Sequence, residues 1–313
     1  MPSKTLSVVI PLFNEENSIR ELWQRLSAVM DALGIESEII FVDDGSGDQT
    51  GAELQKICQA DPRVKLITLS RNFGHASALA AGLDHAQNQL VVLMDGDLQD
   101  KPESIPDFIA EWEKGFEVVY AVRTTRKENL LLRGAFKAFY RLLNRMSGIK
   151  QPLDAGIFCL IDRKVVDVIR SMSERNRYFP GLRAYAGFRQ TGIPVDRDAR
   201  YAGKSRVRPI GLVKLALDGL IAFSYIPLRM VTAAGVIVSF SAFAYMIRVL
   251  YKKLVSHEAI LGWASTLTAI LFLGGMQLLT LGIVGEYIGR IYEEVKKRPY
   301  YIIKSIAAGK TGE

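Results

Sequence analysis

The feature that most constrains this chain is a pair of long apolar stretches toward its C-terminal end. Residues 230–247 and residues 259–285 contain no charged side chain. A helix needs roughly 20 apolar residues to cross a bilayer, whereas buried core helices are usually shorter. Each stretch is close to that length or longer. We therefore predict two membrane-spanning helices, over about residues 228–250 and 260–284.

These two spans also decide on which side of the membrane the rest of the chain lies. Residues 251–258 leave room only for a tight turn, so both ends of the resulting hairpin face the same compartment. The apolar run at residues 6–12 is too short for a secretory leader, so we expect that compartment to be the cytoplasm. Basic residues beside the hairpin agree with this orientation: Lys204, Arg206, Arg208, Lys214, Lys296, Lys297, Arg298 and Lys304. The chain is therefore expected to be a multi-pass protein of the cytoplasmic (inner) membrane.

The domain boundaries follow from the change in composition along the chain. We expect residues 1–208 to form a large cytoplasmic domain with a mixed α/β pattern. Residues 209–225 have the pattern of an amphipathic helix that lies along the membrane surface. Residues 226–285 form the hairpin. Residues 286–313 form a cytoplasmic C-terminal helix and tail, with no ordered structure expected after Ile306.

The first half of the chain alternates short apolar runs with helical patterns. Alternation of this kind indicates a mainly parallel sheet that is covered by helices on both faces. In such sheets ligands bind at the carboxyl ends of the strands, where the loops converge. We predict strands at residues 6–10, 38–42, 64–69, 90–94 and 118–121, and helices at residues 19–33, 50–60, 75–86 and 105–113.

Charge and cysteine content narrow the possible partners. The formal net charge of +7 is either an ordinary solvated surface or an attraction to anionic lipid headgroups. No nucleic-acid-binding module is found, so we expect no nucleic-acid partner. Cys58 and Cys159 lie in apolar segments and are expected to be reduced core residues. One helical segment carries a basic stripe that is either solvated or in contact with phosphate or membrane: Arg133, Lys137, Arg141 and Arg145.

Acidic residues follow the fourth predicted strand. Asp95 and Asp97 are separated by one residue, so their carboxylates come close together at the strand end and would repel one another. A divalent cation with oxygen ligands removes this repulsion, and a diphosphate can complete its coordination. Gln99 offers a further neutral oxygen. An Asp-x-Asp pair alone also occurs in turns and caps, but its position after an apolar strand, beside other acidic strand ends, favours a metal site.

Two other strand ends carry polar side chains. Asp43 and Asp44 precede a Gly-Ser pair that a turn and a helix cap would explain. That explanation does not require two adjacent acids, one of which would face the cleft and could accept a hydrogen bond from a nucleobase or a ribose. Asn72 is either helix-cap chemistry or part of the same cleft, and Arg71 before it is positioned to meet phosphate.

Two absences exclude common nucleotide-binding enzymes. The chain has no G-x-G-x-x-G after the first strand and no G-x-x-x-x-G-K-[ST], which argues against dinucleotide-dependent enzymes and P-loop enzymes. The Asp-Asp-Gly-Ser and Asp-x-Asp strand ends instead resemble the Rossmann-like GT-A fold of family-2 inverting glycosyltransferases, which use nucleotide diphosphate-sugars.

A narrower resemblance, to the polyprenyl-phosphate glycosyltransferases, extends over nearly the whole chain. That group includes bactoprenol glucosyltransferases, the undecaprenyl-phosphate aminoarabinose transferase and, more distantly, dolichyl-phosphate mannose synthase. Gly96 is a small departure, because alanine is commoner there. The resemblance is carried by residues 70–75, 95–100, 200–206 and 285–290, and by the two-span tail.

This resemblance implies roles for individual residues. A Mg²⁺ or Mn²⁺ ion would be held by Asp95, Asp97 and Gln99. Asp97 and Asp154 would be catalytic, with Asp154 as base or acceptor-site carboxylate. The nucleotide-sugar would be bound by Pro11, Glu15, Asp43, Asp44, Asn72 and Asp95. Acceptor and diphosphate phosphates would be bound by Arg123, Arg133, Ser205 and Arg206.

The resemblance also implies a reaction. We expect inverting transfer of a single sugar, with glucose from UDP-glucose as the first expectation, to polyprenyl (undecaprenyl) phosphate at the cytoplasmic membrane face. The Gln-x-x-Arg-Trp motif of processive polysaccharide synthases is missing, which favours one sugar per acceptor. The alternatives are a related enzyme for another sugar or lipid acceptor, and a non-catalytic membrane protein that binds nucleotide-sugars. Gly285 and Gly289 suit close helix packing and a homo-oligomer; a flippase and a downstream transferase are natural partners.

Overall fold

The structure is a computed structural model of the whole chain, and it describes residues 4–123, 155–172, 174, 177–195, 226–254 and 262–309. The chain separates into two compact units. One unit contains the α/β domain together with the residues from Arg298 onward, and the other contains two long helices. The predicted amphipathic helix at residues 209–225 lies outside the described residues.

The α/β unit is built on a mixed sheet. Within the described residues the strand order is β7-β5-β6-β4-β1-β2-β3-β8. Strands β1 to β4 pair in parallel, whereas β6 and β8 run antiparallel to their neighbours β4 and β3. The strands are β1 (Thr5–Leu12), β2 (Glu36–Asp43), β3 (Val64–Leu69), β4 (Leu90–Leu93), β5 (Val118–Arg123), β6 (Ala155–Asp162), β7 (Gln190–Val195) and β8 (Ile303–Ala308).

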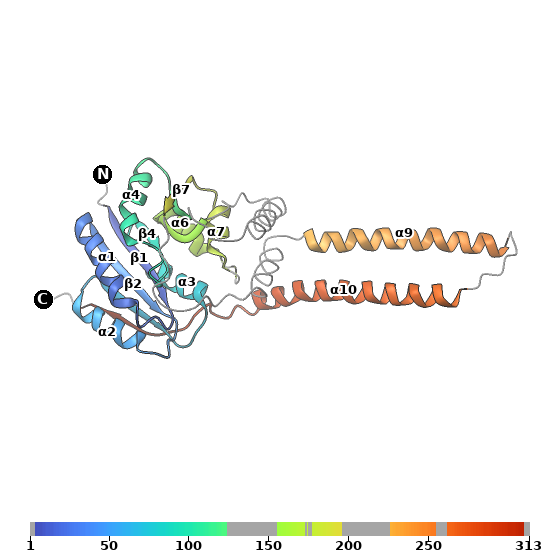
Figure 1. Cartoon of the computed structure of the whole chain (residues 1–313), viewed down its shortest axis with the longest axis horizontal. Helices are drawn as coiled ribbons and strands as arrows, with labels where there is room; N and C mark the ends of the chain where they lie inside the picture. Colours follow the sequence, from blue (N-terminus) through green and yellow to red (C-terminus); the bar gives the residue numbers. More distant parts are fainter. Residues whose placement is uncertain are drawn as a thin grey trace. The chain divides into compact units, whose positions relative to one another are not determined.

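Helices cover both faces of this sheet (Figure 1). Neighbouring residues of a strand point to opposite faces, so Val8 packs into one core cluster and Val9 into the other. This double burial explains why the central strands are continuous apolar runs. The helices are α1 (Ile19–Leu33), α2 (Thr50–Ala60), α3 (His75–His85), α4 (Ile105–Glu113) after a short 3₁₀ turn (Pro102–Ser104), α6 (Arg163–Ser171) and α7 (Phe179–Tyr185).

The second unit contains α9 (Ile226–Leu254) and α10 (Trp263–Val295), which lie side by side (Figure 1). Val231–Val249 has a mean hydropathy of 1.5 and Thr266–Val295 one of 2.0, and each is long and apolar enough to cross a membrane. Their large side chains, such as Phe240 and Leu271, are exposed. Helices with this composition and an apolar exposed surface agree with the predicted hairpin.

The end of the chain differs from the sequence-based expectation. We expected no ordered structure after Ile306, but Ala307 and Ala308 belong to β8 and pair with Leu66 and Lys65 of β3. Backbone hydrogen bonds to a sheet edge stabilise a strand even where its side chains are small and polar. The C-terminal residues therefore complete the sheet beside β3.

Candidate active site

An open cavity of about 410 Å³ lies at the carboxyl ends of the central strands. Four adjacent strands, β4, β1, β2 and β3, end at this edge of the sheet, and each contributes residues that follow it. The volume is within the usual range for a small-molecule site. The cavity is lined by Pro11, Leu12, Phe13, Glu15, Asp44, Asn72, Gly74, His75, Ala78, Asp95, Gly96, Asp97 and Ile157.

The structure brings together most of the residues that were predicted to bind the donor. Pro11, Glu15, Asp44, Asn72 and Asp95 all line the cavity, as does Asp97. They come from loops far apart in sequence, and the parallel order of the strands makes them neighbours.

Asp43 does not line the cavity. It is the last residue of β2 and is 4% exposed, and its Oδ1 accepts a hydrogen bond from the Ser46 amide at 3.0 Å. Successive strand residues point to opposite sides, so only one of the two adjacent acids can face the cleft. Asp43 serves the turn after β2, which is the alternative that the sequence left open.

Asp44 shapes the cavity wall through its backbone partners. Its two carboxylate oxygens accept hydrogen bonds from the amides of Phe73, at 2.7 Å, and Gly74, at 2.9 Å. Burial raises the pKa of Asp44, while these two hydrogen bonds act in the opposite direction. The carboxylate is only 2% exposed. It therefore fixes the loop that carries Asn72 next to the cavity.

Gly45 allows that loop to approach closely. Its φ of +70° is a conformation that L side chains rarely adopt. A Cβ atom at this position would lie 2.5 Å from the carbonyl carbon of Arg71 and 2.8 Å from the amide nitrogen of Asn72. The glycine in Asp-Asp-Gly-Ser is thus required by the backbone of the neighbouring loop.

The Asp-x-Asp loop follows β4 and lines the same cavity as the loop after β3. Asp95 Oδ1 accepts a hydrogen bond from His75 Nε2 at 2.9 Å, and Asp97 Oδ1 accepts one from the Gln99 amide at 3.2 Å. Leu98, between Asp97 and Gln99, has a φ of +59° although its side chain is buried. A bulky residue in this region is a genuine outlier, and such outliers cluster at functional sites.

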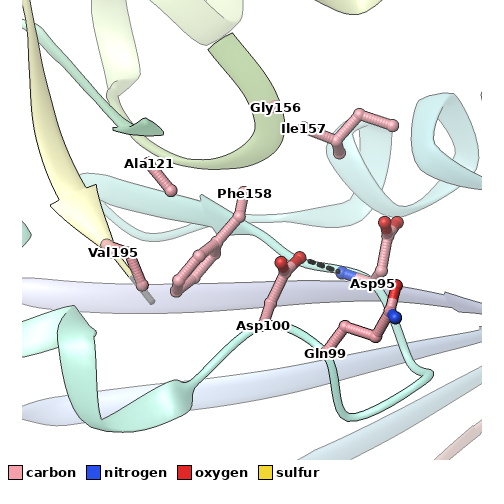
Figure 2. Close-up of a pocket in the computed structure, with 8 residues that line it drawn as sticks. All are labelled: Asp95, Gln99, Asp100, Ala121, Gly156, Ile157, Phe158 and Val195. Atoms are coloured by element: carbon pink, nitrogen blue, oxygen red, sulfur yellow. Dashed lines mark hydrogen bonds between the residues drawn. The ribbon is translucent and has the colours of Figure 1, made fainter. Parts of the chain in front are cut away.

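Asp95 also borders a second, smaller cavity of about 20 Å³, room for about one water molecule (Figure 2). Gln99 lines this cavity and not the larger one. The buried carboxylate of Asp100 accepts a hydrogen bond from the Asp95 amide at 3.3 Å and so supports the loop from below. The other lining residues are Ala121, Gly156, Ile157, Phe158 and Val195.

The carboxylates of the Asp-x-Asp loop suit a cation that is bound partly by protein and partly by a substrate, rather than one fully enclosed by protein. Within the described residues, no three His, Cys, Asp or Glu side chains converge on a ready-made metal site. Asp95 and Asp97 both face the larger cavity. Mg²⁺ is commonly bound by one or two carboxylates together with substrate phosphates and water. Two carboxylates at the wall of an open cavity match that pattern.

The predicted acceptor-side residues are mostly outside the part of the chain that the structure describes. Asp154, Arg133, Ser205 and Arg206 lie outside the described residues, as does the basic stripe. Arg123 is the last residue of β5, and only its backbone is described.

Sequence reasoning assigned no role to several residues that line the cavity, among them His75 and Ile157. His75 stood in a recognised segment, and the preceding Gly74 signalled a helix start that would bring it to the strand edge. Ile157 lies in β6, where the pairing with β5 is irregular. The partner of Tyr120 is Cys159 and that of Val122 is Ala155, so β6 uses four residues where β5 uses two. Bulges are common next to active sites, and no sequence pattern marked this one.

With this geometry, comparison with known proteins is decisive. The sequence profile of "Glycosyl transferase family 2" matches residues 7–170, which include the whole Asp-x-Asp loop and the described strands from β1 to β6 except the first two residues of β1. The chain belongs to glycosyl transferase family 2. Its α/β unit has the GT-A fold, and the protein is a glycosyltransferase. The fold and enzyme class expected from the sequence are thereby confirmed.

Curated relatives in this family are similar along almost their full length. The chain is 46% identical to "Uncharacterized glycosyltransferase YkcC" of Bacillus subtilis, over 95% of this chain and 93% of that protein. It is 38% identical to "Prophage bactoprenol glucosyl transferase homolog" of Escherichia coli, over 96% and 99%. It is 39% identical to "Bactoprenol glucosyl transferase" of Shigella phage SfII, over 97% and 99%.

The C-terminal helices are matched as well. The profile "GtrB C-terminal hairpin" covers residues 226–291, which span α9 and most of α10. The narrower resemblance to the bactoprenol glucosyltransferase group, first drawn from four short segments, is therefore confirmed over both parts of the chain.

Proposed function

We propose that this family-2 enzyme transfers one sugar from a nucleotide diphosphate-sugar to a polyprenyl phosphate. The proposal is based on a cavity at the strand ends that is lined by Asp44, Asp95 and Asp97. The same chain also has two helices long and apolar enough to cross a membrane. Relatives named bactoprenol glucosyl transferase, similar over nearly their whole length, support bactoprenol as the acceptor lipid and glucose as the sugar. The phosphate of the acceptor and the UDP of the donor are inferred from the resemblance of the sequence to the polyprenyl-phosphate glycosyltransferases.

The chemistry of this reaction is mainly an electrostatic problem. An anionic lipid phosphate must approach an anionic diphosphate donor, whose leaving group gains charge as the glycosidic bond breaks. A divalent cation, Mg²⁺ or Mn²⁺, would neutralise that charge. Asp97 and Asp95 would hold it at the wall of the cavity, with Gln99 as a further oxygen donor near Asp95. Attack on the face opposite the leaving group would invert the anomeric configuration.

The acceptor side of the site is assigned by resemblance. Arg123, Arg133, Ser205 and Arg206 would gather the lipid phosphate and the diphosphate, because guanidinium groups bind phosphate in a bidentate manner. A phosphate is already ionised at neutral pH, so a strong general base is less necessary than for a hydroxyl acceptor. Asp154 would then orient the acceptor rather than remove its proton.

The two apolar helices support a reaction at the membrane surface. A polyprenyl chain stays in the bilayer, so the enzyme must bring its cleft to the membrane surface. We infer that α9 and α10 span the cytoplasmic (inner) membrane as a hairpin and that the domain of residues 1–208 lies in the cytoplasm with a juxtamembrane helix at 209–225. A homo-oligomer, a flippase and a downstream transferase belong to the same proposal.

The test uses purified full-length protein, undecaprenyl phosphate, Mg²⁺ and a panel of radiolabelled UDP- and GDP-sugars, followed by lipid extraction. Label should enter the lipid phase with UDP-glucose and be lost when EDTA removes the metal. Nucleotide-sugar binding without lipid label from any donor would contradict the proposal and would favour another acceptor or a non-catalytic role. If a diacylglycerol hydroxyl were the acceptor, Asp154→Asn should abolish transfer, because a hydroxyl needs a base.

A further inference from the structure

The residues that follow the second long helix make contacts beyond those of an ordinary edge strand. β8 pairs with β3 over the register from Lys65↔Ala308 to Leu69↔Ile303. Hydrogen bonds continue at both ends: the Gly309 amide donates to Val64 O at 3.0 Å, and the Ser70 amide donates to Ile302 O at 2.9 Å. We call residues 300–309 the C-terminal segment. Residues 302–309 of this segment are therefore paired with β3 and with Ser70, the first residue after β3.

Ser70, the first residue after β3, begins the loop that forms one wall of the donor cavity. Residues 70–74 connect β3 to α3, and Asn72 and Gly74 line the cavity. The far end of the loop is held by the Asp44 carboxylate through two backbone amides. The near end is held at Ser70 by the carbonyl of Ile302. The loop thus has one attachment in the site itself and one in the C-terminal segment.

The C-terminal segment also holds α3, the helix on the other side of the loop. Tyr301 donates a hydrogen bond from its hydroxyl to Asp84 Oδ2 at 2.7 Å, near the end of α3. Arg170 Nε lies 3.7 Å from the other oxygen of Asp84. The guanidinium of Arg177 lies 4.4 Å from the centre of the Tyr300 ring. Burial and the hydrogen bond to Asp84 raise the pKa of Tyr301, so its hydroxyl remains a donor at neutral pH.

We propose that the C-terminal segment positions the loop at residues 70–74, and through it helps the donor cavity to bind the nucleotide part of the sugar donor. Tyr301 is a positioning residue in this proposal, since it acts through α3 and β3 and does not line the cavity. The proposal rests on the function proposed above, because it assumes a uridine nucleotide as ligand. It gives the residues beyond the second long helix a role in catalysis as well as in closing the sheet.

The alternative is that the C-terminal segment only protects the edge of the sheet. The two roles differ in what a small change should do. If the segment only closes the edge, loss of the Tyr301 hydroxyl lowers thermal stability and leaves nucleotide affinity unchanged. If it positions the loop, nucleotide affinity falls while affinity for the lipid acceptor stays the same.

The first experiment compares Tyr301→Phe with wild type and with Tyr185→Phe in the full-length protein. Tyr185 is 65% exposed, so the same chemical change there serves as a matched control. We expect Tyr301→Phe to raise the Kd of UDP, measured calorimetrically with Mg²⁺, and the KM of UDP-glucose by about threefold to tenfold, the range of one hydrogen bond. For Tyr301→Phe, the KM of undecaprenyl phosphate should stay within about twofold of wild type. For Tyr185→Phe, the Kd of UDP and the KM of UDP-glucose should also stay within about twofold of wild type. An unchanged Kd in a folded Tyr301→Phe protein, or equal losses for both substrates, would overturn the proposal.

A second measurement needs no variant. Coupling between two sites is reciprocal, so if the C-terminal segment supports UDP binding, UDP must stabilise the C-terminal segment. Hydrogen exchange of the wild-type protein should slow at residues 300–306 as well as 70–75 when UDP and Mg²⁺ are added. Protection confined to the cavity residues would refute the positioning role while leaving the transferase assignment intact. Failure of the wild type to bind UDP or to label lipid would instead count against the proposed function.

Discussion

An alanine at position 45 would test how the donor cavity is held together. The residue would have to adopt a φ of +70°, which costs an L-amino acid about 1–2 kcal/mol. Its Cβ would also lie 2.5–2.8 Å from backbone atoms of Arg71 and Asn72, which cannot rotate away as a side chain can. Overpacking of this kind costs about 1–3 kcal/mol. We therefore expect Gly45→Ala to lower the unfolding free energy by about 2–5 kcal/mol.

The assay is thermal unfolding of the full-length protein in detergent, together with UDP binding. For a domain of this size, each kcal/mol lowers the Tm by about 2–4 °C, so the expected shift is roughly 4–20 °C. UDP affinity should also fall, because the Arg71–Asn72 peptide must move away from the cavity wall. Gly47→Ala is the matched control: nothing lies within 4 Å of a Cβ there and its φ is not positive. A Gly45→Ala protein with the Tm and UDP affinity of Gly47→Ala would refute the reasoning.

Two further substitutions test other parts of the domain. A Cβ at Gly96 would lie 2.2 Å from the far end of the Leu12 side chain, and its nearest backbone neighbour would be the Pro11 carbonyl oxygen at 3.4 Å. Because the close contact is with a flexible side chain, Gly96→Ala should lower the unfolding free energy by about 1 kcal/mol and leave transfer within about threefold of wild type. A loss of transfer above tenfold would mean that the Asp-x-Asp loop cannot adjust. Burial raises the pKa of Asp61, but the Arg63 side-chain hydrogen bonds and further donors outweigh it, so the pKa is lowered overall. The Asp61–Arg63 pair therefore stabilises the fold at pH values above about 4, the pKa of Asp61 in the unfolded chain. This stabilisation is lost as the pH falls through the lower pKa of Asp61 in the folded protein. The Tm difference between wild type and Arg63→Met should narrow when scans are repeated below about pH 4, and a difference independent of pH would contradict the assignment.

The sequence predicted the central sheet well because its strands are buried on both faces. β1 and β2 contain uninterrupted apolar runs, at residues 8–12 and 39–42, that lead into polar residues, and this pattern has few other interpretations. β8 was missed for the opposite reason. It is an edge strand whose Lys304 and Ser305 are exposed, so its sequence has little apolar signal and its stability comes from backbone pairing with β3.

The candidate site was predictable to the extent that it follows from strand order. Residues just after parallel strands must meet at one edge, which brings Asp44, Asn72 and Asp95 together without knowledge of any coordinates. What the sequence could not supply is the direction of individual side chains. Asp43 turns away from the cavity into its own turn, and Ile157 lines the cavity from β6, a strand far along the chain from the loops that carry the acidic residues.

The conformation of the site loops was also beyond sequence reasoning. Leu98 has a left-handed backbone that its residue type disfavours, and only the surrounding packing holds it there. The C-terminal segment also contacts α3 through Tyr301 and Asp84, residues that are 217 positions apart. Contacts at such separations leave no local pattern in the chain.

The measurement that tests the account most directly is the structure of the lipid product. Full-length protein with undecaprenyl phosphate, UDP-glucose and Mg²⁺ should yield one new lipid, which mass spectrometry and proton NMR can define. We predict one glucose joined to the lipid phosphate in the β configuration, and no such product from Asp97→Asn under the same conditions. A product with several sugars, a retained α linkage, a sugar on a hydroxyl, or wild-type yield from Asp97→Asn would contradict it.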